Sequence, residues 1–194
     1  MRLKPPPEDC VYTKTGKAID PAEITIDEIC LEDIAYALAG IYRYTGHSRI
    51  SVATHSLAVA EAVEMQTRMD YDDNGPLVRS ALMHDAAEAY FGDVALPLKR
   101  YMKKDYHDAV ARCEDLIYEK YDLELHCNFP LIRTVDLAIV RYEMERGPGY
   151  PEEGTAPLNV AASYALWLAT KHAEKCGGAE KAFLQKCKEL GIKD

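Results

Sequence analysis

Four residues that can bind a metal ion stand in otherwise apolar stretches of the sequence: His55, His84, Asp85 and Asp136. A charged side chain that is buried without a partner is costly, so each of them needs a hydrogen bond or an ion. Alone, His55 or Asp136 reads more simply as a hydrogen-bonded core residue. Together, two imidazoles and two carboxylates suit a divalent transition metal and leave positions open for water and substrate, whereas a closed structural site is usually rich in cysteine.

A further carboxylate, Glu88, follows His84 by four positions and Asp85 by three. On one continuous helix these spacings place the three side chains on the same face. Glu88 could then exchange a proton with an attacking water or a leaving oxygen, provided that burial raises its pKa toward neutrality. The alternative is that Glu88 only orients His84 from outside the ligand set.

One reaction open to a metal-activated water is attack on a phosphoryl group, which needs further cations because negative charge develops on the phosphoryl oxygens. Arg43 and Lys99 are the candidates for this role. His47 could touch phosphate as well, or it could satisfy terminal carbonyls at the end of a helix. The basic run at 99–104 could draw in a polyphosphate, although a solvated loop or helix start explains it equally well.

Helices have to position these residues, because apolar side chains recur at three- and four-residue spacing through most of the chain. The pattern predicts a first helix from Leu31 to near Gly46 and a second helix with Ser51 as its N-cap. Before them, residues 12–19 read as two short extended pieces around a Thr-Gly turn. We therefore expect a short hairpin or an ordered arm at the N-terminus.

The third helix is predicted to be the central one, because it is apolar around most of its circumference. Pro76 fits its first turn, and the helix should continue past His84 to near Gly92. Residues 93–99 should then form a loop, because the residue before Pro97 avoids helical geometry.

The second half of the chain shows the same periodicity. Helices are predicted at 105–122, 130–146, 158–175 and 179–190. About seven helices result, without the alternation of strands and helices that a parallel sheet requires. The sequence therefore predicts an all-α bundle, formed by residues 1–194 as one domain.

Composition restricts the partners and the compartment. The chain has 23 Lys plus Arg and 32 Asp plus Glu among 194 residues, a formal net charge of −9. This acidic balance argues against binding to nucleic acid or to anionic membranes. Six cysteines without a CxxC pair indicate reduced thiols. Since a signal peptide and a long apolar run are also missing from the sequence, we expect a cytoplasmic protein.

The order His55, His84-Asp85 and Asp136 is similar to the H…HD…D signature of the HD-domain metal-dependent phosphohydrolases. The resemblance implies an HD-domain helical bundle in which these four residues hold a divalent ion, with Mn, Co, Zn, Fe and Mg all candidates. The HDxGK run of the two-metal HD phosphodiesterases is absent, which favours a single ion.

Neighbouring motifs narrow the resemblance. The runs HDAAE at 84–88, GD at 92–93 and PLK at 97–99 are similar to the HDxxE…GD…PxK pattern of bacterial 5′-deoxynucleotidases and their phage relatives. Segments within 32–56 resemble the subgroup that includes phage dATP triphosphohydrolases. The resemblance covers about residues 10–146.

The same resemblance implies individual roles. It makes Glu88 the acid or base and Asp93 a second polar group near the attacking water or the sugar. It makes Arg43 a phosphate-binding residue, so that Arg43→Ala should weaken turnover and leave the melting temperature nearly unchanged. Tyr44 stands where relatives often have Trp or Phe.

The function expected from these residues is hydrolysis of small nucleotides, most of all deoxynucleotides, by attack of metal-activated water on phosphorus. The choice between a 5′-deoxynucleotidase and a deoxynucleoside triphosphate triphosphohydrolase stays open, as does a homo-oligomeric state. The alternative is a metal-dependent nucleotide sensor or regulatory binding module that has lost turnover. An intact proton-transfer group beside the ligands argues against that alternative.

Overall fold

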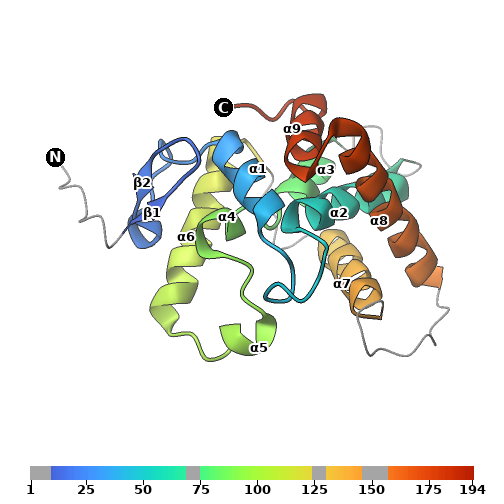
Figure 1. Ribbon diagram of the computed structural model, residues 1–194, viewed down its shortest axis with the longest axis horizontal. Helices are drawn as coiled ribbons and strands as arrows, with labels where there is room; N and C mark the ends of the chain where they lie inside the picture. Colours follow the sequence, from blue (N-terminus) through green and yellow to red (C-terminus); the bar gives the residue numbers. More distant parts are fainter. Residues whose placement is uncertain (1–9, 69–74, 124–129, 146–156) are drawn as a thin grey trace.

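The structure, a computed structural model, describes residues 10–68, 75–123, 130–145 and 157–194 (Figure 1). It begins with a short antiparallel hairpin in which Val11 pairs with Ile19 and Tyr12 with Ala18. The elements in chain order are β1 (Val11–Tyr12), β2 (Ala18–Ile19), the 3-10 turn η2 (Pro21–Glu23), α1 (Leu31–Gly40), α2 (Val52–Thr67), α3 (Gly75–Met83), α4 (Glu88–Phe91), α5 (Leu96–Lys99), α6 (Lys104–Lys120), α7 (Pro130–Glu145), α8 (Pro157–Cys176) and α9 (Ala179–Glu189).

The predicted all-α architecture with an N-terminal hairpin is confirmed. In the described residues, the seven longer helices α1, α2, α3 and α6 to α9 correspond to the seven predicted. Helix α4 is a single turn within the range predicted for the third helix, and α5 is a single turn that was not predicted. The predicted bounds of the last four helices are met within two residues, apart from residue 146, which lies outside the described residues. Apolar periodicity located these helices because each of them buries one face.

The centre of the bundle is α2, and the prediction that the third helix is central was wrong. Side chains all around α2 are buried, from Val52 to Thr67, and the helix packs against α1, α3, α7, α8 and α9. Figure 1 shows α7 and α8 beside α2, while α6 and the hairpin lie at the other end of the molecule. Ser51 is its N-cap as predicted, since the hydroxyl oxygen accepts the Thr54 N–H at 3.2 Å.

The first helix ends six residues earlier than predicted, at Gly40. Beyond it the backbone forms strand-like pairs: the Val52 N–H donates to the Ile41 carbonyl at 2.9 Å, and the Arg43 N–H donates to the Ile50 carbonyl at 3.0 Å. These bonds replace the helical ones and close a turn. Arg43 and His47 therefore lie on a turn rather than on a helix.

The third helix is interrupted, contrary to the prediction of a continuous helix to Gly92. Helix α3 ends at Met83, and residues 84–87 form turns before α4 begins at Glu88. Through this break the backbone bonds span three residues rather than four, as in the Glu88 N–H to Asp85 carbonyl bond of 3.0 Å. The tighter winding is typical of 3-10 geometry, which periodicity of apolar residues does not reveal.

The segment predicted as a loop contains the short helix α5. Pro97 occupies its first turn, where the missing N–H is not needed and the fixed φ suits a helix. Leu96, the residue before Pro97, is itself the first residue of α5, so the steric restriction on it does not prevent this single helical turn.

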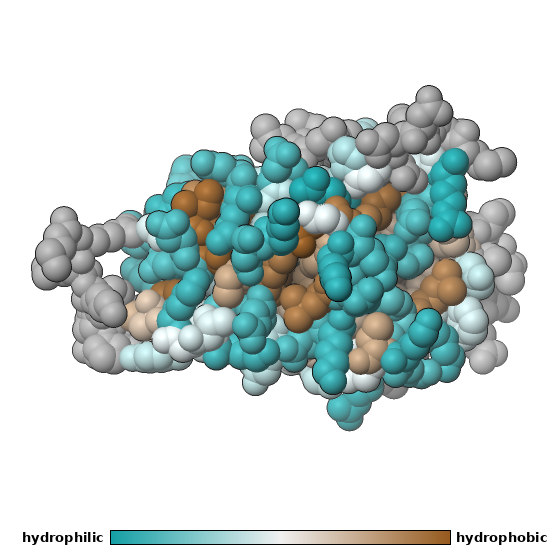
Figure 2. All heavy atoms as spheres, turned by 90° about the horizontal axis from the view of Figure 1, so that it is seen from above, coloured by the Kyte–Doolittle hydropathy of each residue, from teal (hydrophilic) through white to brown (hydrophobic). Residues whose placement is uncertain are grey.

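The described residues give the protein a mainly polar surface on the face shown in Figure 2 and free cysteine thiols. The face seen in Figure 2 is mainly hydrophilic, with hydrophobic residues in separate spots. All five cysteines in the described part of the chain are free thiols. Within the described ranges, no helix combines the length and the apolar character that a membrane span requires.

A buried carboxylate joins the hairpin to the helices. Asp33, in the first turn of α1, is 3% exposed and accepts the Thr15 N–H at 2.8 Å and the Thr15 hydroxyl at 2.7 Å. The Cys30 thiol lies 3.1 Å from the second oxygen. Burial raises the pKa of Asp33, but the hydrogen bonds from Cys30 and Thr15 outweigh it and hold the pKa below its ordinary value.

We predict that Asp33→Asn lowers the free energy of unfolding by about 1–3 kcal/mol near neutral pH, because the buried donors lose a charged acceptor. A depressed folded-state pKa contributes stability above the unfolded-state value, near 3.8, and this stability is lost as the pH falls through the folded-state value. Urea titrations should show a constant difference between the two proteins above about pH 5 that shrinks below 3.8. Glu32→Gln, at an exposed neighbouring carboxylate, is the control and should change little.

Candidate metal centre

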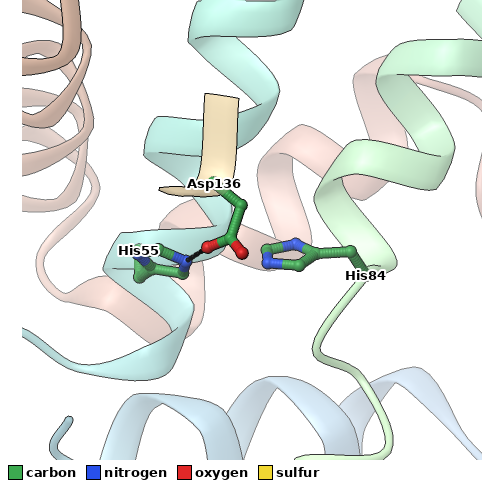
Figure 3. A group of neighbouring side chains, drawn as sticks. All are labelled: His55, His84 and Asp136. Carbon is green, nitrogen blue, oxygen red and sulfur yellow. Dashed lines mark hydrogen bonds and ion pairs between the residues drawn. The ribbon is translucent and has the colours of Figure 1, made fainter. Parts of the chain in front are cut away.

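Three helices bring a compact group of ligand atoms together. His55 comes from α2, His84 from the break directly after α3, and Asp136 from α7. Their candidate ligand atoms all lie within 4.8 Å of one another. In Figure 3 the Asp136 carboxylate lies between the two imidazole rings, and its Oδ1 is 3.0 Å from the His55 Nε2. Residues 81 positions apart in the sequence thus form one polar site.

Both imidazoles are held by a hydrogen bond at the nitrogen away from this group. The His84 Nδ1–H donates to the Ala81 carbonyl at 2.8 Å, and the His55 Nδ1–H donates to Glu143 Oε1 at 2.8 Å. A carbonyl or carboxylate oxygen can only accept, so the ring nitrogen must carry the hydrogen. Each ring therefore presents Nε2 to the site, as metal-binding histidines do.

Asp85 adjoins this group. Its Oδ2 is 3.2 Å from the His84 Nε2, 3.8 Å from the His55 Nε2 and 3.5 Å from the Arg43 Nη1. It is not part of the tightest set of ligand atoms, which consists of the two histidines and Asp136. The structure therefore brings all four predicted ligands together, with Asp85 at the edge.

The electrostatic field of the site favours positive charge. Burial lowers the pKa of His84, but the charges of Asp85 and Asp136 outweigh it and raise the pKa to about 9. Burial raises the pKa of Asp85, yet His84, with His55 and Arg43 behind it, holds that pKa well below its usual range. Because Asp85 and Asp136 stay ionised in this buried site, they attract a cation.

The residues fit a divalent ion. The His84 Nε2 is buried and makes no hydrogen bond, although Asp85 lies beside it as a charged neighbour. A buried polar nitrogen without a partner is unfavourable, and coordination to a cation would satisfy it. Nitrogen and carboxylate donors in equal number suit Mn, Co, Zn or Fe better than Mg.

Glu88 starts α4 and lies next to the ligands. One carboxyl oxygen is 3.6 Å from the Lys99 Nζ, and the other is buried without a hydrogen-bond partner. Burial raises the pKa of Glu88, and the charges of Asp85 and Asp93 add to the effect, so that it reaches about 9. Burial thus raises the pKa of Glu88 as its predicted role requires, although to a value above neutrality, and the role itself stays a prediction.

Arg43 is buried rather than exposed, which changes one expectation. Its Nε donates to Glu143 Oε2 at 3.1 Å, and its Nη1 approaches Asp85. Removing one partner of a buried ion pair leaves the other charge uncompensated, at a cost of about 3–5 kcal/mol. These contacts replace the expectation of a nearly unchanged melting temperature with the prediction that Arg43→Ala lowers it.

The remaining predicted residues surround the centre. Asp93 Oδ2 accepts the Tyr44 N–H at 3.2 Å and so holds the turn that carries Arg43. Among the site residues described above, Lys99 forms an ion pair only with Glu88. His47 is exposed on that turn, and its ring makes no side-chain hydrogen bond within the residues that the structure describes. Its contact with phosphate stays a prediction.

Sequence reasoning missed two carboxylates. Glu143 is fully buried behind His55 and follows Asp136 by seven positions, two turns of α7, so this spacing was the available signal. Glu114, on α6, is partly buried, and burial with the charge of Asp85 raises its pKa. The sequence around Glu114 gave no signal, because a glutamate on an amphipathic helix fits a solvated face equally well.

We predict that the wild type binds one divalent ion and that His84→Ala and Asp85→Ala each abolish this binding. In the wild type, a chelator should lower the melting temperature, because an ion that binds only the folded state at a hundred times its Kd contributes about 2.7 kcal/mol. Metal content by mass spectrometry and thermal denaturation check both points. His172→Ala, on α8, is the control and should keep its metal. Stoichiometric metal in His84→Ala would contradict the assignment.

Comparison with known proteins agrees with this centre. A family model described as HD domain matches residues 52–177. The uncharacterized protein YfdR of Escherichia coli strain K12 is 33% identical over 135 residues, 69% of each chain. The uncharacterized protein RCAP_rcc00048 of Rhodobacter capsulatus is 30% identical over 145 residues, 71% of this chain and 72% of that protein. The chain therefore belongs to the HD-domain family, within a superfamily of metal-dependent phosphohydrolases.

Proposed function

We propose that this HD-domain protein is a phosphohydrolase of small nucleotides, with deoxynucleotides as the preferred class. The observation that carries the proposal is the position of Glu88, a buried carboxyl group beside a cluster of two histidines and two aspartates. Membership of the HD family supports metal-dependent hydrolysis. The motifs shared with 5′-deoxynucleotidases and dATP triphosphohydrolases support a nucleotide substrate.

The ion would be held by the Nε2 atoms of His55 and His84 and by the carboxylates of Asp85 and Asp136. When bound, a divalent cation supplies a Lewis acid that lowers the pKa of water and neutralises phosphoryl charge. The hydrogen bonds from the two Nδ1 atoms keep the imidazoles oriented for this task. Arg43, fixed by Glu143, presents its Nη atoms on the Asp85 side of the centre.

Glu88 would supply the proton. Burial raises the pKa of Glu88, so its carboxyl group can hold a proton and act as a general acid. As the bond from phosphorus to the leaving oxygen breaks and the water oxygen bonds to phosphorus, the Glu88 proton passes to the leaving oxygen. A proton from the water then restores the carboxyl group. Lys99, 3.6 Å away, stabilises the carboxylate in between.

A substrate screen tests the proposal. The protein is loaded in turn with Mn²⁺, Co²⁺, Zn²⁺, Fe²⁺ and Mg²⁺ and offered all deoxy- and ribonucleotide mono-, di- and triphosphates, with the products separated by ion exchange. A 5′-deoxynucleotidase releases inorganic phosphate from a monophosphate, and a triphosphohydrolase releases tripolyphosphate. If the protein binds a nucleotide but hydrolyses none of them with any of the five metals, the sensor function replaces the proposed hydrolysis.

We predict that Glu88→Gln separates binding from chemistry. The amide keeps the size of the side chain but cannot exchange a proton, so turnover should fall by about 10²–10⁴-fold while metal content persists. Steady-state kinetics of the metal-loaded variant on the substrate found in the screen, together with metal analysis, measure both effects. Glu61→Gln, a carboxylate of α2 that pairs with Lys186 at 3.2 Å, is the matched control and should keep turnover.

Two results would contradict this role. If Glu88→Gln loses its metal, Glu88 is a ligand or supports one, and Asp93 becomes the next candidate for proton transfer. If turnover continues at the original rate with metal in place, Glu88 only orients its neighbours.

A further inference from the structure

The most enclosed carboxylate of the centre is Glu143, whose side chain is 0% exposed. Its two oxygens receive hydrogen bonds from three donors. Oε1 accepts the His55 Nδ1–H at 2.8 Å, whereas Oε2 accepts the Arg43 Nε–H at 3.1 Å and the Tyr44 hydroxyl at 3.2 Å. One side chain of α7 therefore contacts both α2 and the turn after α1.

The first bond determines what His55 presents to the metal site. Because the carboxylate only accepts, Nδ1 carries the hydrogen and Nε2 faces Asp136. The ring is fully buried and has carboxylates on both sides, so it cannot rotate without breaking one of these bonds. Partners of this kind change metal affinity by about 10- to 100-fold when they are removed.

The second bond determines the direction of Arg43. A guanidinium group is planar, so fixing Nε fixes the plane that contains both Nη atoms. In this structure Nη1 then lies 3.5 Å from Asp85 Oδ2, at the edge of the metal site. The Tyr44 hydroxyl lies 3.2 Å from the same oxygen of Glu143 and 3.2 Å from the Val140 carbonyl, so two acceptors on α7 share its one hydrogen.

We propose that Glu143 is a positioning residue that couples the metal ligand His55 to Arg43, so that one carboxylate sets both metal affinity and phosphate affinity. The phosphate half of this inference rests on the proposed function, whereas the metal half does not. The competing explanation is that Glu143 only stabilises the contact between α7 and α2.

Glu143→Gln separates these explanations. A glutamine has one acceptor oxygen, so it cannot serve both His55 and Arg43, and its amide nitrogen would face a donor. The probes are Co²⁺, followed by its d–d absorption, and inorganic phosphate, titrated into the Co²⁺-saturated protein. We expect Co²⁺ affinity to fall by about 10- to 100-fold, with a changed absorption spectrum. Phosphate affinity should fall by at least about 10-fold, as for loss of an oriented charged contact.

The matched control is Glu64→Gln. Glu64 lies on α2 and, like Glu143, pairs with a buried cation, here Lys186 at 2.8 Å, so its loss should lower the melting temperature. It lies outside the metal centre, and the Co²⁺ affinity, the spectrum and the phosphate affinity should stay as in the wild type. If Glu143→Gln fails to fold, Tyr44→Phe removes one donor to Oε2 and should lower phosphate affinity by about 2- to 10-fold.

The outcomes are distinct. If Glu143→Gln is less stable but keeps its Co²⁺ affinity and spectrum, or if Tyr44→Phe binds phosphate normally, the proposal is wrong. A loss of Co²⁺ affinity without a loss of phosphate affinity also overturns the coupling. A wild type that binds Co²⁺ but neither phosphate nor nucleotides would refute the proposed function and the coupling, and the Co²⁺ titrations would still decide whether Glu143 positions His55.

Discussion

The contact between His55 and Glu143, two ionisable side chains that are both fully buried, is the constraint that organises the centre of this protein. Burying charge is costly unless every charged atom finds a partner. The partners come from two parts of the chain: Arg43 and Tyr44 from the turn after α1, and Asp136 from α7. The surrounding helices have to place these groups within hydrogen-bond distance, and their packing around α2 does so.

The break between α3 and α4 has a chemical consequence. In this break each backbone hydrogen bond joins residues three positions apart, so the side chains of such residues lie one above the other. Asp85 and Glu88 are such a pair. Burial raises the pKa of Glu88, and repulsion between the two like charges raises it further. The same break ends the last turn of α3 at Met83, so that the Ala81 carbonyl is free to accept the His84 ring. A continuous helix would use that carbonyl for its own backbone.

The sequence predicted the helices well because apolar periodicity records which face is buried. It predicted the metal centre because imidazoles and carboxylates in apolar stretches need a common partner. It did not show the early end of α1, since the pairing of residues 41–43 with residues 50–52 depends on contacts between separate segments. Glu143 escaped notice because a glutamate on an amphipathic helix reads as part of the solvated face, and only the packing of α7 on α2 buries it.

The distances along the chain between the partners of Glu143 bear on how the protein folds. Glu143 is 88 residues from His55 and 100 residues from Arg43, so their contacts close long loops. The helices around α2 can form from local contacts, but the polar centre is complete only when α7 has docked. An ion that binds the assembled centre consequently stabilises the docked position of α7. Metal supply would then shift the equilibrium between the docked and the undocked position of this one helix.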